Sequence, residues 1–212
     1  MDPDPELAKK IAADIAVRME RSKIDIPIGV YNRHCHLTEE HFKTLFGAGS
    51  APKRVKDIKQ PGFWAAAEAI EVHGPKGALK KVRLVAPYRS HTQIEVAVTD
   101  ALALGLKPPV RESGDVKGSA GAVLVGPAGK VELTEGVIIA QRHVHFSPKE
   151  AAAIGVESGQ ILRMRCGKGG GRSTIFEDCI ARVSDKYSLE FHLDTDEANA
   201  AGVKTGDLSW IV

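Results

Sequence analysis

Arg33-His34-Cys35-His36-Leu37-Thr38 is the stretch from which this fold can be worked out. It returns 109 residues later, at position 142 instead of 33, as Arg142-His143-Val144-His145-Phe146-Ser147. In an extended strand, residues i and i+2 point to the same face, so each copy can aim two imidazoles at one point. Neutral imidazole is a common zinc ligand. One such pair could be two ordinary surface histidines, but two pairs in the same local context favour metal binding.

Each copy lies where a predicted strand hands over to a predicted helix. The apolar runs 26–31 and 136–140 precede the copies and have the composition of strands. Thr38 and Ser147 follow them as helix N-cap residues, and Pro148 stands at the first helical position after Ser147. The surroundings of the two histidine pairs are therefore repeated as well.

A second, weaker repeat supplies a third ligand to each half. The segment 95–106 matches 192–203, since both read as a strand end followed by an Ala-rich helix and a glycine C-cap. Aligning Gly105 with Gly202 gives an offset of 97 and places Glu95 opposite His192. The two predicted ligand sets are His34, His36 and Glu95 in one half, and His143, His145 and His192 in the other. Three protein ligands with an open fourth position are typical of catalytic zinc.

Composition excludes several functions. The 212 residues carry a formal charge of +2 with 5% aromatic residues, which does not favour nucleic-acid binding. There is no apolar run long enough for a membrane span and no signal-peptide pattern. The three cysteines form no CxxC motif, as expected for a reduced compartment. Cys35 should point away from the two histidines beside it and serve as a packing residue.

The predicted fold class is mainly β with short helices: two small β-barrel domains related by an internal repeat, preceded by an N-terminal amphipathic helix. Short strands every 8 to 12 residues, separated by glycine and proline, indicate barrels. We expect a terminal segment at 1–23, whose helix covers 5–21, a first barrel half at 24–115 and a second at 116–212. The terminal helix has no counterpart in the repeat, so it either caps the barrels or docks elsewhere.

The chain resembles the phosphate propanoyltransferases of bacterial microcompartments, the PduL-type phosphotransacylases. The resemblance covers nearly the whole chain from residue 24 onward, and both His-x-His copies are specific to it. The matching stretches are 28–37, Gly74-Pro75-Lys76-Gly77, 82–89, Gln93-Ile94-Glu95, Arg111-Glu112-Ser113-Gly114-Asp115, 138–145 and 192–200. Cys35 departs from the family pattern, which more often has valine there.

The resemblance implies two barrels that meet at a dinuclear zinc site, with two zinc ions per chain held by the two ligand sets named above. It implies that Arg89 binds phosphate. It also implies a set of coenzyme A contacts: Val30, Tyr31, Asn32, Lys76, Arg83 and Asn199. The implied reaction interconverts propanoyl-CoA or acetyl-CoA plus phosphate with acyl phosphate plus CoA.

We expect the phosphate held at the zinc site to attack the thioester directly, without an acyl-cysteine. The ligands alone leave two alternatives open: a dinuclear zinc hydrolase, for which Asp194 and Asp196 are candidate bases, and a non-catalytic zinc-binding module. Expected partners are acyl-CoA and phosphate, with microcompartment shell or cargo proteins as further partners of residues 5–21. The sequence leaves open whether the chain forms a homo-oligomer. The expected location is the microcompartment lumen, with the cytoplasm as the alternative.

Overall fold

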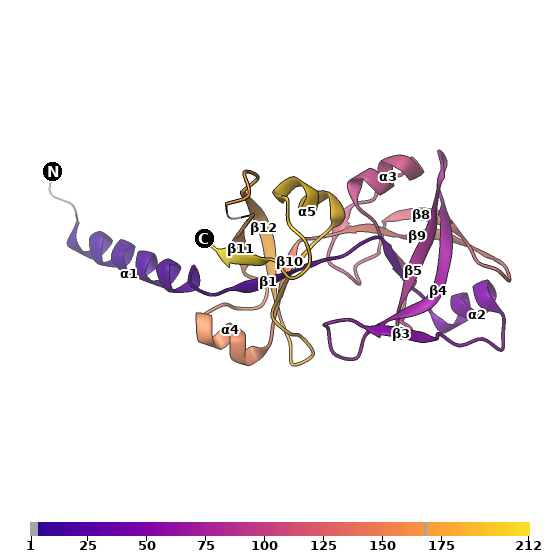
Figure 1. Cartoon of the computed structure of the whole chain (residues 1–212), viewed down its shortest axis with the longest axis horizontal. Coiled ribbons are helices and arrows are strands. Elements are labelled where there is room, and N and C mark those ends of the chain that lie inside the picture. Colours follow the sequence, from indigo (N-terminus) through magenta and orange to yellow (C-terminus); the bar gives the residue numbers. More distant parts are fainter. Residues whose placement is uncertain (1–3, 168) are drawn as a thin grey trace. The chain divides into compact units, whose positions relative to one another are not determined.

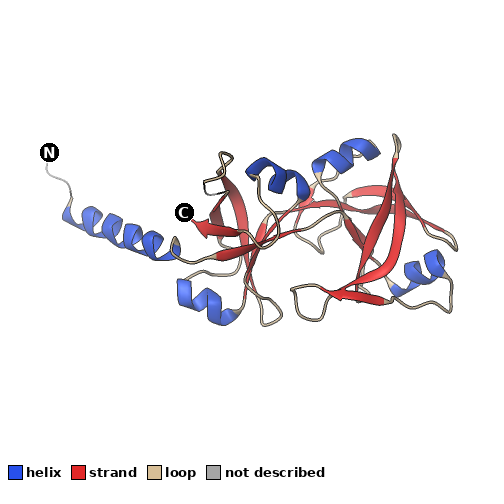
Figure 2. Ribbon diagram, in the orientation of Figure 1, coloured by secondary structure: helices blue, strands red, loops and turns tan. Residues whose placement is uncertain are grey.

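The computed structural model describes residues 4–167 and 169–212, so residues 1–3 of the expected terminal segment lie outside the described residues. The chain divides into two compact units. Unit 1 comprises Met1–Val30, Arg142–Leu193 and Glu197–Val212, and unit 2 comprises Tyr31–Gln141 and Asp194–Asp196. Strands dominate both units, and the helices are short apart from the first (Figures 1 and 2).

Unit 1 is a closed barrel of six strands. Their order around the barrel is β1 (Ile26–Val30), β13 (Glu190–Leu193), β10 (His143–Phe146), β12 (Thr174–Val183), β11 (Ile161–Cys166) and β14 (Leu208–Ile211), which returns to β1. The pairs β1–β13 and β10–β12 are parallel, and the other four pairs are antiparallel. Closure leaves the barrel strands without free edges.

Unit 2 contains a ring of six strands with the same pattern of directions. The ring is β9 (Lys130–Ala140), β6 (Gln93–Glu95), β2 (His34–His36), β5 (Ala78–Ala86), β4 (Trp64–His73) and β8 (Ala120–Val125), which returns to β9. Here β9–β6 and β2–β5 are the parallel pairs. Two further strands, β3 (Arg54–Asp57) and β7 (Val110–Arg111), extend the sheet.

The two rings superimpose in topology, so the internal repeat and the predicted pair of barrels are confirmed. In each ring one antiparallel pair lies between the two parallel pairs, namely β13–β10 in unit 1 and β6–β2 in unit 2. Strand β10 therefore corresponds to β2, and β13 corresponds to β6. These are the four strands that carry the predicted metal ligands.

The expected boundaries at 24–115 and 116–212 are wrong, because the two halves exchange strands. Strand β1 precedes the first His-x-His copy in the sequence but pairs with β13 and β14 in unit 1. Strands β8 and β9 come after residue 115 but pair with β4 and β6 in unit 2. A sequence repeat shows only which local motifs recur. Which strands pair depends on the closure of each ring, and that involves residues far apart in the chain.

Each barrel has its own apolar core. In unit 1 the core includes Ile28, Phe146 and Phe191, all fully buried. In unit 2 it includes Phe42 and Cys35. A buried aromatic or large aliphatic side chain stabilises the folded state by about 1.5 to 3 kcal/mol relative to an exposed one. The prediction that Cys35 packs away from its neighbouring histidines is confirmed by its place in this core.

The helices that follow the histidine pairs begin at the predicted caps. In unit 2, Thr38 accepts a hydrogen bond from the backbone of His41 (3.1 Å) at the start of α2 (Glu39–Phe46). In unit 1, Ser147 and Glu150 form a capping box at the start of α4 (Pro148–Ile154). The short helices α3 (Val98–Leu104) and α5 (Thr195–Ala201) follow the strands that carry Glu95 and His192.

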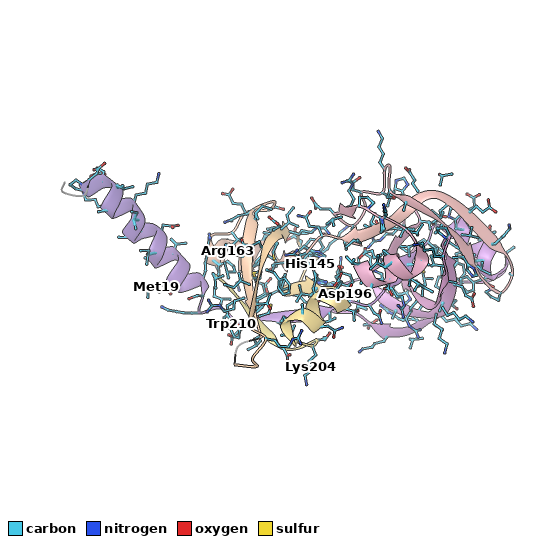
Figure 3. The ribbon with its side chains drawn as sticks, turned by 90° about the horizontal axis from the view of Figure 1, so that it is seen from above. Met19, His145, Arg163, Asp196, Lys204 and Trp210 are labelled. Carbon is cyan, nitrogen blue, oxygen red and sulfur yellow. The ribbon has the colours of Figure 1, made fainter. Side chains whose placement is uncertain are left out.

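Helix α1 (Pro5–Arg21) matches the predicted N-terminal helix. Its apolar residues remain exposed: Leu7 by 55%, Ile11 by 50%, Ile15 by 51% and Met19, labelled in Figure 3, by 58%. Arg21 ends the helix and donates from Nε to the carbonyl of Ile154 (2.9 Å) in the same unit. No helix among the described residues is both long and apolar enough to cross a membrane.

Two Gly-Pro-x-Gly turns close hairpins in unit 2, and each packs on the end of a helix. Gly74 begins the turn between β4 and β5, and Gly126 begins the turn between β8 and β9. A Cβ at Gly74 would lie 2.3 Å from the carbonyl oxygen of Leu104, and a Cβ at Gly126 would lie 2.4 Å from that of Leu45. The close approach lets the turn donate a backbone hydrogen bond to the helix C-terminus, from Ala128 to Leu45 (2.9 Å) in the second case.

Gly126→Ala should therefore destabilise the protein. The new methyl group meets backbone, which cannot move aside as a flexible side chain could, and we expect the free energy of unfolding to fall by about 1 to 3 kcal/mol. Gly49→Ala is the matched control, because a Cβ there meets nothing within 4 Å. Urea unfolding of both variants tests this; equal stability of the two would contradict it.

Candidate metal centres

The ligand set of unit 2 is assembled by the pairing of β2 with β6. His34 lies directly opposite Glu95 in the antiparallel register, and His36 lies two residues further along the same face. His34 Nε2 is 3.6 Å from Glu95 Oε2, and His36 Nε2 is 3.8 Å from Glu95 Oε1. One potential ligand atom of each of these three residues lies within 4.8 Å of the other two.

Backbone carbonyls determine which ring nitrogen of each histidine faces this point. Nδ1 of His34 lies 3.0 Å from the carbonyl oxygen of Asn32, and Nδ1 of His36 lies 2.9 Å from that of Val85. A carbonyl only accepts, so Nδ1 carries the proton in the neutral ring and Nε2 presents its lone pair toward Glu95. Burial is the largest cause that lowers the pKa of His36 well below its ordinary value, with the charges of His34 and Arg89 adding to it. Two lone pairs facing a carboxylate fit a bound cation.

The ligand set of unit 1 is assembled in the same way by β10 and β13. His143 lies directly opposite His192, and the rings of His143, His145 and His192 have centroids 4.5 to 4.7 Å apart. Figure 3 labels His145. Among the described residues, the buried Nε2 atoms of His145 and His192 have no hydrogen-bond partner, although Glu190 Oε2 lies 3.1 Å from the latter. Buried polar atoms are normally paired, and a metal ion would supply the missing partner.

Burial also keeps His145 neutral. Desolvation is the largest cause that lowers the pKa of His145 to about 2, and the charges of His192 and Arg182 lower it further. The ring of Tyr187 stacks on that of His145 at 3.9 Å. A neutral imidazole is the form that binds metal.

An arginine precedes each histidine pair and binds a carboxylate on the helix after the third ligand. Arg33 pairs with Asp100 of α3, and Arg142 Nε pairs with Glu197 Oε1 of α5 at 2.6 Å. Asp100 and Glu197 are separated by the same 97 positions that separate Glu95 from His192. The sequence reasoning missed these two pairs, although the arginine recurs in both copies and the acidic residue recurs at the known offset. The ion pairs join the strand of the histidines to the helix that follows the third ligand.

A hydrogen-bond network holds the carboxylate ligand of unit 2. Glu95 Oε1 accepts from Gln93 Nε2 (2.6 Å) and from Ser113 Oγ (2.8 Å). Arg89 Nη1 donates to the same Ser113 oxygen (3.0 Å), so Arg89 lies beside this ligand set, and its role in binding phosphate stays a prediction. Ser113 and Gln93 were not predicted as site residues. Gln93 could have been found, because it lies two residues before Glu95 on the same strand face.

The chain is similar to known proteins over most of its length. The model of the family described as phosphate propanoyltransferase matches residues 27–204. The phosphate propanoyltransferase of Thermotoga maritima is 48% identical over 91% of this chain and 91% of its own length. Those of Priestia megaterium and Shewanella putrefaciens are 48% and 43% identical, covering 86% and 96% of this chain and 83% and 94% of their own.

The chain belongs to the phosphate propanoyltransferase family. It is therefore an acyltransferase, and membership implies coenzyme A thioester and phosphate as its substrates. The histidine and glutamate sets are the two groups among the described residues whose chemistry and spacing suit a metal ion.

The six predicted coenzyme A contacts divide between the units, and their role stays a prediction. Val30 and Asn199 belong to unit 1, and the other four belong to unit 2. The Tyr31 hydroxyl donates to the carbonyl of Ala140 (3.2 Å), and Arg83 Nη1 donates to that of Ala66 (2.7 Å). Arg83 is also the direct strand neighbour of His34, so one predicted contact lies next to a ligand.

The metal-free protein should lose stability as the pH falls below about 6.5. Unfolded histidines bind protons below that pH, while folded His36 and His145 resist protonation because their pKa values are lowered. The unfolded state then binds more protons, and each histidine contributes a slope of up to about 1.4 kcal/mol per pH unit. Urea unfolding in chelator between about pH 7 and about pH 5 measures it. His145→Gln should remove about half of the slope, and an unchanged slope in that variant would refute this assignment.

Proposed function

We propose that this chain interconverts acyl-CoA plus phosphate with acyl phosphate plus CoA, using two zinc ions, one in each ligand set. The main supporting observation is that two equivalent strand pairs each bring three potential metal ligands together. Nε2 of His34 and His36 carries no proton in the neutral ring, and Nε2 of His145 and His192 has no hydrogen-bond partner among the described residues. Family membership supports the acyl transfer to phosphate. Propanoyl-CoA and acetyl-CoA are the proposed thioesters.

Zinc is the metal that the donors suit best. Imidazole nitrogen favours zinc over magnesium and calcium, which prefer oxygen ligands. Three protein ligands leave a position for substrate, as in catalytic rather than structural zinc sites. Bound zinc would polarise the thioester carbonyl and offer a position for phosphate oxygen or the CoA sulfur.

Arg89 supplies the orientation of phosphate in this proposal. Its guanidinium is a planar fork that can bind two phosphate oxygens, while the hydrogen bond to Ser113 holds it beside Glu95 and His36. A phosphate oxygen then forms the bond to the acyl carbon, the carbon–sulfur bond breaks, and CoA leaves as a thiolate. Fixing the two reactants in contact lowers the entropic part of the barrier.

The thiols of the chain support direct attack rather than an acyl-cysteine. Cys35, Cys166 and Cys179 are all buried. Burial raises the pKa of the Cys35 thiol far above its usual range and raises those of Cys166 and Cys179 to about 12. The thiolate is the nucleophilic form, so none of the three is suited to attack a thioester.

A zinc hydrolase is the alternative function, and an assay of CoA release with and without phosphate distinguishes it from the proposed one. Asp196, one of its two candidate bases, accepts hydrogen bonds from the backbone and the hydroxyl of Thr99 (2.9 and 2.7 Å), so it already caps α3. A hydrolase would release CoA in the absence of phosphate, whereas the proposed enzyme requires phosphate. The non-catalytic module is set aside because the chain belongs to a family of enzymes.

The purified protein should contain about two zinc ions per chain, counted by elemental analysis. His34→Ala and His143→Ala should each remove about one ion and reduce turnover at least about a hundredfold, because each variant lacks one of the three protein ligands of its set. His73→Ala is the control, since His73 is bound to Glu71 outside both sets. Full turnover in protein freed of metal would overturn the proposal.

Arg89→Lys should raise the KM for phosphate about tenfold while changing the KM for acyl-CoA less than about twofold. Lysine keeps the positive charge but cannot bind two oxygens with a planar fork. Initial rates of CoA release at varied phosphate and varied propanoyl-CoA measure both constants. Lys43, an exposed cation paired with Glu39 on α2, offers Lys43→Arg as a control that changes neither. Equal effects on both substrates would mean that Arg89 only supports the fold.

We also propose that α1 docks on microcompartment shell protein or on neighbouring copies, in the lumen of the compartment. Leu7, Ile11 and Ile15 recur every four residues and keep half or more of their surface exposed, so the helix does not bury this stripe on its own unit. An amphipathic helix with an exposed stripe suits a hydrophobic groove on a partner.

Deleting residues 1–20, which keeps Arg21 and its hydrogen bond to Ile154, should therefore leave turnover and melting temperature within error of the full chain and lower self-association or co-purification with shell protein. Ile11→Glu combined with Ile15→Glu should act in the same way without shortening the chain. Lys9→Glu combined with Lys10→Glu serves as a control for added negative charge. A fall in melting temperature of several degrees on deletion would support a structural cap instead.

A further inference from the structure

The loop between β7 and β8 brings Ser113 into contact with three residues of the unit 2 site. Its hydroxyl lies 2.8 Å from Glu95 Oε1, 3.0 Å from Arg89 Nη1 and 2.9 Å from Gln93 Nε2. The loop is anchored there by its own backbone, because the amide of Gly114 donates to Gln93 Oε1 at 2.7 Å. Gly114 has a φ of +106°, a conformation that favours glycine.

The direction of every bond in this cluster follows from the groups involved. A hydroxyl has one proton and two lone pairs, arginine only donates, and an ionised carboxylate only accepts. The Ser113 proton must therefore go to Glu95, and its two lone pairs accept from Arg89 and from Gln93. The Gly114 amide identifies Oε1 of Gln93 as the acceptor, so the Gln93 amide group donates one proton to Glu95 (2.6 Å) and one to Ser113.

Burial makes these bonds matter. Gln93 is 1% exposed and Glu95 is 5% exposed, so little solvent competes for the same partners. Hydrogen bonds to charged groups in such surroundings are stronger than those in water. Oε1 of Glu95 thus accepts from two donors and also lies 3.8 Å from His36 Nε2, while Oε2 lies 3.6 Å from His34 Nε2.

We propose that Ser113 is a positioning residue that links the phosphate-binding arginine to the metal-binding carboxylate. The Ser113 hydroxyl accepts a hydrogen bond from Arg89 and donates its proton to Glu95, and in this way orients both side chains. Phosphate affinity and zinc retention therefore both depend on Ser113. Gln93 fixes the loop and supports the same carboxylate oxygen. This proposal rests on the proposed function, in which Arg89 binds phosphate and Glu95 binds zinc.

Ser113→Ala in the zinc-loaded full chain tests the link. We expect the KM for phosphate to rise about tenfold, with the KM for propanoyl-CoA changed less than about twofold, because one charge-assisted hydrogen bond to Arg89 is lost. Zinc should also pass to a chelator about tenfold faster, as followed with a metal indicator and without any turnover. Ser113→Thr keeps the hydroxyl and should restore both values to within about threefold of the wild type.

Asp115→Asn is the matched control in the same loop. Asp115 makes an exposed ion pair with Arg111 (3.4 Å), which is outside the cluster and contributes little. Its kinetics, zinc loss and melting temperature should match those of the wild type. If Ser113→Ala and Asp115→Asn instead alter all of these values alike, the loop is merely structural and the proposal fails.

A double variant separates linkage from independent effects. Because Ser113 acts on phosphate through Arg89, Arg89→Ala with Ser113→Ala should show about the same phosphate KM as Arg89→Ala alone. If the phosphate KM of the double variant instead rises by the product of the two single effects, the two residues act independently and the link is refuted. A wild type that releases CoA without phosphate would refute the proposed function, and an Arg89→Lys variant with unchanged phosphate KM would refute the phosphate-binding role of Arg89 within it. A phosphate-dependent wild type whose Ser113→Ala variant keeps both its phosphate KM and its zinc would refute only the role of Ser113.

Discussion

The antiparallel pairing of a His-x-His strand with the strand of the third ligand is the constraint on which both sites depend. His34 faces Glu95 across β2 and β6, and His143 faces His192 across β10 and β13. Side chains alternate along a strand, so a slip of one residue would turn the ligands of that strand to the opposite face and expose core residues such as Cys35. The apolar core that holds the register therefore also holds the ligand geometry.

The equivalence of the two sites extends beyond the ligands. Arg33 with Asp100, and Arg142 with Glu197, join the histidine strand of each unit to the helix after its third ligand. The sites differ in the chemistry of the third residue, because unit 1 has the imidazole of His192 where unit 2 has the carboxylate of Glu95. A metal ion bound by two histidines and a glutamate would carry less net positive charge than one bound by three histidines, and would be less electrophilic.

The surroundings of Glu95 show how a site gains polar neighbours from distant segments. Gln93 belongs to the same short strand, Arg89 follows β5, and Ser113 comes from a loop after β7. Each hydrogen bond in the group has a single allowed direction, which restricts the cluster to one arrangement. Such restriction orients Glu95 and Arg89, because neither is held firmly by its own flexible side chain.

The sequence by itself determined the barrel class, the caps at Thr38 and Ser147, the terminal helix, and the two sets of three residues that the strands bring together as candidate ligands. These follow from spacing, since i and i+2 share a strand face and the offset between Gly105 and Gly202 aligns Glu95 with His192. Only the tertiary structure decided that β1 closes unit 1 while β8 and β9 close unit 2, and that Ser113 reaches Glu95. Strand exchange and loop placement depend on pairing between residues that are far apart in the chain. The local sequence pattern does not specify which distant strand will become the pairing partner.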